Sequence, residues 1–134
     1  QWIEGGMSFV AETGSGHAFV MDGAPEAGGR NLGPRPMETV LAGTGACTAF
    51  DVVLILKRSG QDVTACKVDV KAERAETDPK VFTKIHMHFV VSGPGLTDAA
   101  VQPAVKLSDE TYCSASIMLG KTAEISTSFV IDPS

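Results

Sequence analysis

The sequence is poor in cysteine, in aromatic side chains and in runs of basic residues. It has three cysteines, one tryptophan and one tyrosine, and its formal net charge is −5. Three cysteines are too few for the disulfide framework of a small secreted domain, and an odd number cannot all pair within one chain. The absence of a basic run argues against an electrostatic footprint for nucleic acid. We therefore expect no nucleic-acid partner, and a cytoplasmic location in which the thiols stay reduced.

We expect neither a targeting segment nor a membrane span of ordinary length. Residues 1–6 have neither a basic region nor an apolar core. The longest apolar stretch, Val40–Leu56, is short for a bilayer and contains Asp51, whose charge would be costly there. We interpret this stretch as a helix of a folded protein and expect no membrane partner.

The most prominent feature present is a long apolar helix, which we expect to run from Met37 to Arg58. Glu38 lies in its first turn and Lys57 in its last, which complements the helix dipole, and Gly60 can supply the left-handed stop. Because the helix is apolar almost all round, it needs cover on every side. A chain of 134 residues has little material for that. We therefore predict a symmetric homodimer that wraps the helix.

The rest of the chain predicts strands and a second helix. Alternation of apolar and polar residues, with turn residues between, predicts strands over residues 7–12, 17–22, 65–73, 81–91 and 123–131. Thr97 or Asp98 caps an amphipathic helix before the last strand. The apolar stripe of this helix is expected to comprise Val101, Val105, Ser108 and Tyr112. The order of elements is α+β, and we treat residues 1–134 as a single domain.

Cys47 and Cys113 are the residues with the clearest chemical potential. Cys47 lies within the long helix, and Cys113 follows the second helix. If the two thiols meet in the fold, one can attack a peroxide as the thiolate while the other captures the sulfenic acid. The alternative is that both are small core residues, because free cysteine is among the most buried residue types. From the residues alone, the core interpretation is the more common outcome.

Four segments of the chain together carry a family resemblance. They are residues 33–38, 45–53, 79–85 and 107–114. They resemble the OsmC family of osmotically inducible and organic hydroperoxide resistance proteins, and in particular its OsmC-like redox branch. The resemblance implies an α+β fold in which long central helices pack between antiparallel β-sheets of an intertwined homodimer. It also implies a thiol-dependent peroxidase that reduces organic hydroperoxides in oxidative-stress defence.

The resemblance assigns a role to each cysteine. Cys47 corresponds to the residue that attacks the peroxide, and Cys113 to the residue that resolves the sulfenic acid as a Cys47–Cys113 disulfide. An external dithiol, which is a lipoyl group in one branch of the family, would reduce that disulfide. We expect no bound cofactor. Apolar neighbours would favour a small organic hydroperoxide as substrate. The pocket expected for it comprises Met37, Leu41, Tyr112, Ile117 and Met118.

The sequence departs from the family pattern where the attacking thiol is activated. The family places an arginine near the first hairpin, and this hairpin has none, although it ends in His17. The family also places a glutamate ten residues before the attacking cysteine. In this chain that position is Met37, and Glu38 follows it. Without a neighbouring cation, Cys47 should keep a high pKa in apolar surroundings.

Several charged residues are candidate modulators of the Cys47 thiol. They are Asp51, Glu38, Arg30, Arg35 and His17. Asp51 lies one turn after Cys47, and its negative charge should raise the pKa of the thiol further. The missing activating residues favour a second hypothesis, in which the protein is weakly active or inactive and binds or senses a small apolar ligand. The retention of two cysteines favours the peroxidase.

Three further residues are expected to have structural roles. His86 and His88 share one face of an expected strand without an evident third ligand, so we expect no metal site there. Cys66 falls on the inward face of its strand and is expected to be a core residue.

Overall fold

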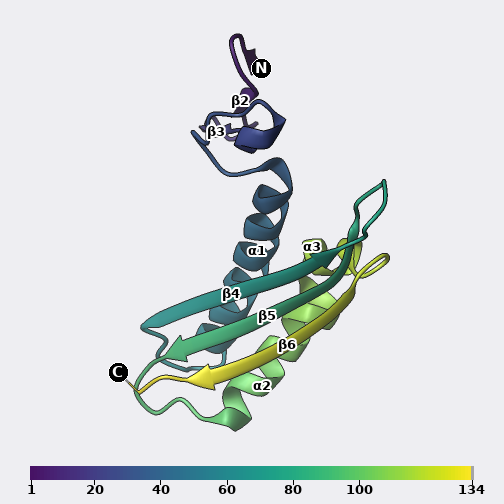
Figure 1. Ribbon diagram of the computed structural model, residues 1–134. Helices are drawn as coiled ribbons and strands as arrows, with labels where there is room; N and C mark the ends of the chain where they lie inside the picture. The colour runs from purple at the N-terminus through teal and green to yellow at the C-terminus, as the bar shows by residue number, and fades with distance from the viewer. Residues whose placement is uncertain (134) are drawn as a thin grey trace. The chain divides into compact units, whose positions relative to one another are not determined.

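The computed structural model describes residues 1–133. They form two compact units, Gln1–Ala42 and the described residues from Gly43 onward, whose boundary falls inside helix α1. Figure 1 labels most of the helices and strands of both units. Each unit is described by itself.

The first unit contains a small antiparallel sheet in the order β1-β2-β3. Its elements are β1 (Trp2–Ile3), β2 (Ser8–Glu12), β3 (Ala18–Met21) and the 3₁₀ turn η1 (Pro25–Ala27). The hairpin predicted around residues 13–16 is confirmed, since Val10 of β2 pairs with Val20 of β3. β1 was not predicted, because two residues are too few to show a periodic pattern.

A buried carboxylate fixes the loop that follows β3. Asp22 accepts hydrogen bonds from the backbone N–H groups of Gly23, Arg30 and Leu32, at 2.7, 3.2 and 3.1 Å. Burial acts to raise the pKa of Asp22, but the hydrogen bonds from these donors lower it below its usual value. Asp22 therefore supports the loop as an ionised carboxylate.

The second unit is built on the sheet β4-β5-β6. Its strands are β4 (Ala65–Arg74), β5 (Phe82–Ser92) and β6 (Glu124–Ile131). The predicted alternation is confirmed on β5, where Ile85, Met87, Phe89 and Val91 are buried. Figure 1 shows α2 and the second half of α1 on one side of this sheet. Met87 faces that side, since its sulfur lies 3.6 Å from the hydroxyl of Thr48 on α1.

One feature of this sheet corrects the expectation of antiparallel sheets. β4 and β5 are antiparallel, but β6 runs parallel to β5. The reason is the connection between them: the chain crosses back through helices instead of making a tight turn, and such a crossover brings the next strand in parallel.

Helix α1 (Pro36–Arg58) matches the predicted long helix closely. Its buried residues are Thr44, Gly45, Thr48, Val52 and Leu56. A Cβ at Gly45 would lie 3.0 Å from Cγ2 of Val70, so the absence of a side chain lets α1 approach β4 closely. By length and composition α1 could also cross a membrane, but a core helix passes the same test, and the buried stripe on the sheet is typical of a core helix.

Within the described residues of a single chain, α1 is not covered by other elements on every side. The side chain of Phe50 is 69% exposed, and Val40 is exposed as well. One chain thus covers one stripe of the helix and leaves apolar side chains open on the rest.

The second predicted helix is present but ends differently. α2 (Asp98–Leu107) begins at Thr97, whose hydroxyl accepts a hydrogen bond of 3.3 Å from the N–H of Ala100. The chain continues through a π-helical turn, η2 (Ser108–Tyr112), and a short helix, α3 (Ser114–Leu119). Tyr112 was expected in the buried stripe, but it is 58% exposed. The wider π turn changes the number of residues per turn and carries Tyr112 off the stripe.

Candidate functional site

The structure brings together three groups that the sequence singled out. Cys47 and Asp51 lie one turn apart on α1, and Cys113 lies between η2 and α3. The two Sγ atoms and a carboxylate oxygen of Asp51 all lie within 4.8 Å of one another. All the cysteines are free thiols, with Cys113 fully buried and Cys47 half-buried. This trio, Cys47, Asp51 and Cys113, is the candidate site.

The sulfur of Cys113 is surrounded by hydrogen-bond donors. The hydroxyl of Thr48 donates to it at 3.1 Å, and the backbone N–H of Ser116 donates at 3.4 Å. Burial acts to raise the pKa of Cys113, but hydrogen bonds from Ser116, Thr48 and the thiol of Cys47 outweigh it and lower the pKa below its ordinary value. Cys113 is thus the thiol of the pair that ionises more readily.

The pKa of Cys47 is shifted in the opposite direction, above its ordinary value. Burial is the largest cause of the raised pKa of Cys47, and its hydrogen bond to Cys113 and the charges of Cys113 and Asp51 raise it further. The backbone N–H of Ala115 opposes these effects by donating to the Cys47 sulfur. The charge of Asp51 acts on this pKa in the direction that the sequence predicts, and its role as a modulator of the site stays a prediction. When one thiol of the pair ionises it is therefore Cys113, and Cys47 keeps its proton and donates it in a hydrogen bond to the Cys113 sulfur.

Ser108 links the two helices at the site. Its hydroxyl donates to the backbone oxygen of Thr48 at 3.1 Å and to Oδ2 of Asp51 at 3.4 Å. Sequence reasoning named neither Thr48, Ser108 nor Ser116 as site residues. The only signal available was that each hydroxyl lies within a few positions of a cysteine or of the π turn.

An apolar cavity adjoins Asp51. It has a volume of about 400 Å³ and is lined by Asp51, Leu54, Ile55, Arg58, Ser59, Leu107 and Tyr112. Tyr112 is the one residue of the expected substrate pocket that lines it. Ile117 and Met118 lie on α3 and are 39% and 67% exposed, while Met37 and Leu41 belong to the first unit.

The OsmC-like protein family model matches residues 28–128 of this chain. The chain belongs to the OsmC-like family. The family resemblance seen in the sequence is thereby confirmed.

Individual relatives agree with this OsmC-like assignment. Protein YhfA of Escherichia coli strain K12 is 46% identical over 131 residues, which cover 98% of this chain and 94% of YhfA. A solved structural-genomics chain is 43% identical with a TM-score of 0.90, covering 100% of this chain and 96% of its own. An organic hydroperoxide resistance protein from Elizabethkingia anophelis, solved with thiocyanate bound, is 16% identical with a TM-score of 0.71, covering 97% of this chain and 98% of its own. This last likeness shows the fold alone.

The other candidate modulators lie in the first unit of the OsmC-like chain, where each has a local partner. Nδ1 of His17 lies 3.1 Å from the hydroxyl of Ser15. Nη1 of Arg35 donates to Oδ1 of Asn31 at 2.9 Å. Oε1 of Glu38 accepts from the N–H of Arg35 at 2.9 Å and so caps the start of α1. The backbone N–H of Arg30 donates to Asp22. Their action on Cys47 stays a prediction.

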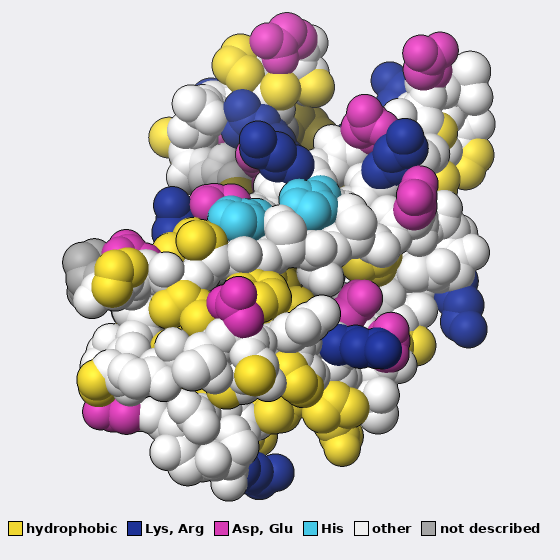
Figure 2. Space-filling view, turned by 90° about the horizontal axis from the view of Figure 1, so that it is seen from below, with side chains coloured by type: hydrophobic (Ala, Val, Ile, Leu, Met, Phe, Trp, Pro, Cys, Tyr) yellow, Lys and Arg dark blue, Asp and Glu magenta, His cyan; other side chains and the backbone are white. Residues whose placement is uncertain are grey.

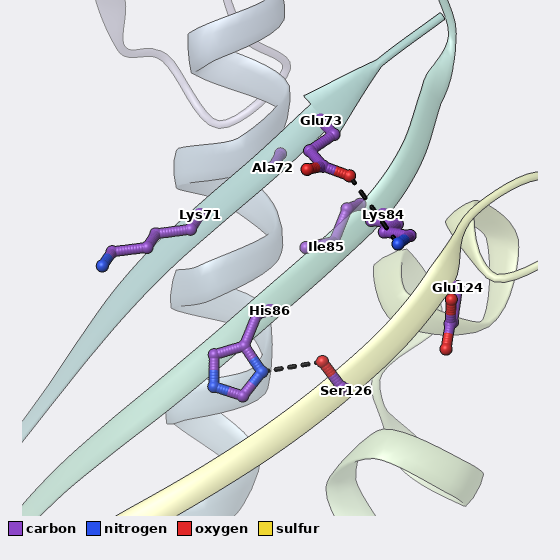
Figure 3. Close-up of a pocket in the computed structure, with 8 residues that line it drawn as sticks. All are labelled: Lys71, Ala72, Glu73, Lys84, Ile85, His86, Glu124 and Ser126. Atoms are coloured by element: carbon purple, nitrogen blue, oxygen red, sulfur yellow. Dashed lines mark hydrogen bonds and ion pairs between the residues drawn. The ribbon is translucent and has the colours of Figure 1, made fainter.

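His86 of the OsmC-like chain borders a different hollow, on the polar face of the sheet. Figure 3 shows His86 beside Ser126, with the lysines and glutamates that line this hollow around them. His86 lies 2.7 Å from the hydroxyl of Ser126 and 2.9 Å from that of Ser128, and His88 lies 2.8 Å from Ser128. Figure 2 shows neighbouring histidine side chains at the surface, close to basic side chains. Serine hydroxyls thus satisfy both ring nitrogens of His86 and Nδ1 of His88, and no cysteine lines the hollow.

Cys66 differs from its expected role in the core. It is half-buried on β4, where it lines an apolar hollow together with Ala46, Ala49, Phe50, Val53, Leu54 and Lys57. Burial raises the pKa of the Cys66 thiol. A protonated thiol on an apolar surface is unreactive, which suits a packing role.

Proposed function

We propose that this OsmC-like protein reduces organic hydroperoxides through its paired thiols, in defence against oxidative stress. The observation that carries the proposal is the approach of Cys47 Sγ to Cys113 Sγ, within 4.8 Å and with both thiols free. Two thiols at this separation can give up two electrons and form a disulfide. The shared fold with an organic hydroperoxide resistance protein supports the choice of substrate class.

The first step uses the hydrogen bond between the sulfurs. The proton of Cys47 passes to the Cys113 thiolate, and the Cys47 thiolate attacks the distal oxygen of the hydroperoxide. A sulfur–oxygen bond forms and the peroxide bond breaks. The alkoxide that leaves takes the proton from Cys113 and departs as an alcohol. Cys113 thereby acts as base and then as acid. Its lowered pKa suits the acid role, whereas the first proton transfer is uphill because the pKa of Cys47 is raised.

The second step closes the disulfide. The Cys113 thiolate attacks the sulfur of the Cys47 sulfenic acid, the sulfur–sulfur bond forms, and hydroxide leaves to become water. An external dithiol then returns two electrons and two protons to the pair. Cys47 is assigned as the attacking residue because it is half-buried and can meet a peroxide, whereas Cys113 is fully buried.

The apolar cavity beside Asp51 favours a substrate with an organic group over hydrogen peroxide. Leu54, Ile55 and Leu107 offer it apolar contacts. Asp51 works against the reaction, because its charge raises the pKa of Cys47. We therefore expect turnover to be slow unless a cation approaches from another chain.

The test is consumption of cumene hydroperoxide in the presence of a dithiol. Cys47→Ser should abolish consumption. Cys113→Ser should allow a single turnover, slower than in the wild type because the base of the first step is lost, and leave a sulfenic acid that a dimedone-type probe traps. Cys66→Ser is the matched control and should behave as wild type. Unchanged consumption by Cys47→Ser would rule out the proposed attack.

A second candidate function rests on the raised pKa of Cys47. A thiol that stays protonated reacts slowly, and such a protein could bind or sense a small apolar ligand in the cavity beside Asp51 instead. Failure of the wild type to consume peroxide with any dithiol, together with saturable binding of an apolar fluorescent probe that Leu107→Asp abolishes, would favour this function.

A further inference from the structure

The candidate site contains three residues of the types that bind metal ions, namely Cys47, Asp51 and Cys113. It presents two sulfurs and one carboxylate oxygen, each within 4.8 Å of the other two. In tetrahedral zinc sites, Zn–S distances of about 2.3 Å and Zn–O distances of about 2.0–2.2 Å place ligand atoms about 3.6–3.8 Å apart. The three groups thus need only small side-chain rotations to surround one ion.

The backbone presents these ligands from ordered elements. Cys47 and Asp51 are four residues apart on α1, a spacing that puts both side chains on one face of a helix. Cys113 reaches the same point from the first residue before α3. Ligands that come from two packed helices are held in place before an ion arrives.

Neighbouring groups orient the ligands in the manner of an outer coordination shell. The hydroxyl of Ser108, which shares its proton between Thr48 O and Oδ2 of Asp51, lies 3.4 Å from Oδ2 and helps to orient the carboxylate. Thr48 and the N–H of Ser116 donate to the Cys113 sulfur, and so stabilise negative charge on it. Hydrogen bonds of this kind tune metal-bound thiolates and carboxylates, and their loss weakens metal binding.

The chemistry of the ligands selects the ion. Thiolates are soft ligands that favour Zn²⁺ and discriminate against Mg²⁺ and Ca²⁺. Three protein ligands leave the fourth tetrahedral position for water or a small molecule. We propose that the reduced Cys47–Cys113 pair and Asp51 bind one Zn²⁺ ion per chain.

Zinc binding and peroxide reduction are separate properties of the same thiols. Binding needs only the reduced pair and no turnover, so it can be present or absent whatever the outcome of the peroxidase assay. If both are present they exclude each other, because metal-bound sulfurs cannot join in a disulfide. Binding also releases the remaining thiol protons, so affinity should rise with pH.

The test uses anaerobic, reduced full-length protein and Zn²⁺ in competition with a chromophoric chelator. Wild type should withdraw one equivalent of Zn²⁺ from the chelator. Co²⁺ in place of Zn²⁺ should give the near-ultraviolet absorption of thiolate ligation. Cys47→Ser and Cys113→Ser should each lose the site, and Asp51→Asn should weaken it by about 10-fold or more. Thr48→Val should weaken it by a similar factor through the Cys113 sulfur.

One control variant and one conservative variant of a ligand distinguish this site from zinc binding elsewhere on the chain. Cys66→Ser should bind as wild type, which places the ion away from β4. Asp51→Asn keeps both thiols, so it remains informative if a cysteine variant folds poorly by circular dichroism. The proposal is overturned if wild type withdraws no Zn²⁺, or if Cys66→Ser loses binding while Asp51→Asn and Thr48→Val retain it.

Discussion

The hydroxyl of Thr48 donates a hydrogen bond of 3.1 Å to the sulfur of Cys113, across a separation of 65 residues in the sequence. Thr48 is the neighbour of Cys47 on α1, so a single turn of helix supplies one thiol and a donor to the other. This bond, with those from Ser116, is why Cys113 ionises more readily although it is buried.

Replacing Thr48 should therefore raise the pKa of Cys113. Thr48→Val keeps the shape of the side chain but removes the donor, so the thiolate loses a charge-assisted hydrogen bond. The expected result is that the first thiolate absorbance step in the ultraviolet moves to higher pH in a Cys66→Ser background. Thr122→Val is the matched control, because that hydroxyl donates to the backbone of Leu119 instead. An unmoved step would show that Thr48 does not stabilise the thiolate.

Replacing either of two glycines of α1 by alanine should change the free energy of unfolding by different amounts. Gly43→Ala meets no atom within 4 Å and should raise the free energy of unfolding by about 0.5–1 kcal/mol, because alanine favours the helix. Gly45→Ala places its Cβ 3.0 Å from Cγ2 of Val70 and should forfeit that gain. Urea unfolding of the two variants checks this. Equal stabilisation by both would mean that α1 does not pack closely on β4.

Asp22 should make the stability of the protein depend on pH. Its folded pKa is lowered, so its contribution to stability is present above the unfolded aspartate pKa of about 3.9 and is lost as pH falls through the folded value. Asp22→Asn should unfold at lower urea concentration than wild type at neutral pH, and the difference should shrink in acid. A difference that stays constant with pH would contradict an ionised carboxylate.

The open face of α1 should be covered by a second copy of the chain. Phe50 is exposed in an apolar hollow that Ala46, Ala49, Val53 and Leu54 also line. Light scattering at micromolar concentration should give a dimer, and Phe50→Lys should shift it toward monomer. Val130→Lys, an exposed apolar position on β6, is the control and should leave the dimer intact. A folded wild-type monomer would refute the dimer.

Much of the fold follows from the periodicity of the sequence. The alternation of polar and apolar residues along β4 and β5 predicts both strands, because each has one face toward the helices. The direction of β6 does not follow, since nothing within a strand encodes whether its partner is parallel. α3 was missed because six residues are too few for a helical period to emerge. The π turn before it has no recognisable sequence signal, which is why the position of Tyr112 was wrong.

The site was predictable in part. The two cysteine motifs, through their family resemblance, predicted that Cys47 and Cys113 meet. The roles of Thr48, Ser108 and Ser116 were not predictable, because a hydroxyl within a helix is equally consistent with exposure to solvent. Only the packing of α1 against η2 and α3 turns these side chains toward the sulfurs and Asp51.

The measurement that tests the central claim most directly is mass spectrometry of the wild-type protein after one equivalent of an organic hydroperoxide. Reaction through the thiol pair predicts a loss of two hydrogens from the intact chain and, after digestion, a cross-linked peptide that joins Cys47 to Cys113. The same treatment of Cys66→Ser should give the same product. An intact chain of unchanged mass, or a cross-link that involves Cys66 instead, would contradict the claim that Cys47 and Cys113 form the redox centre.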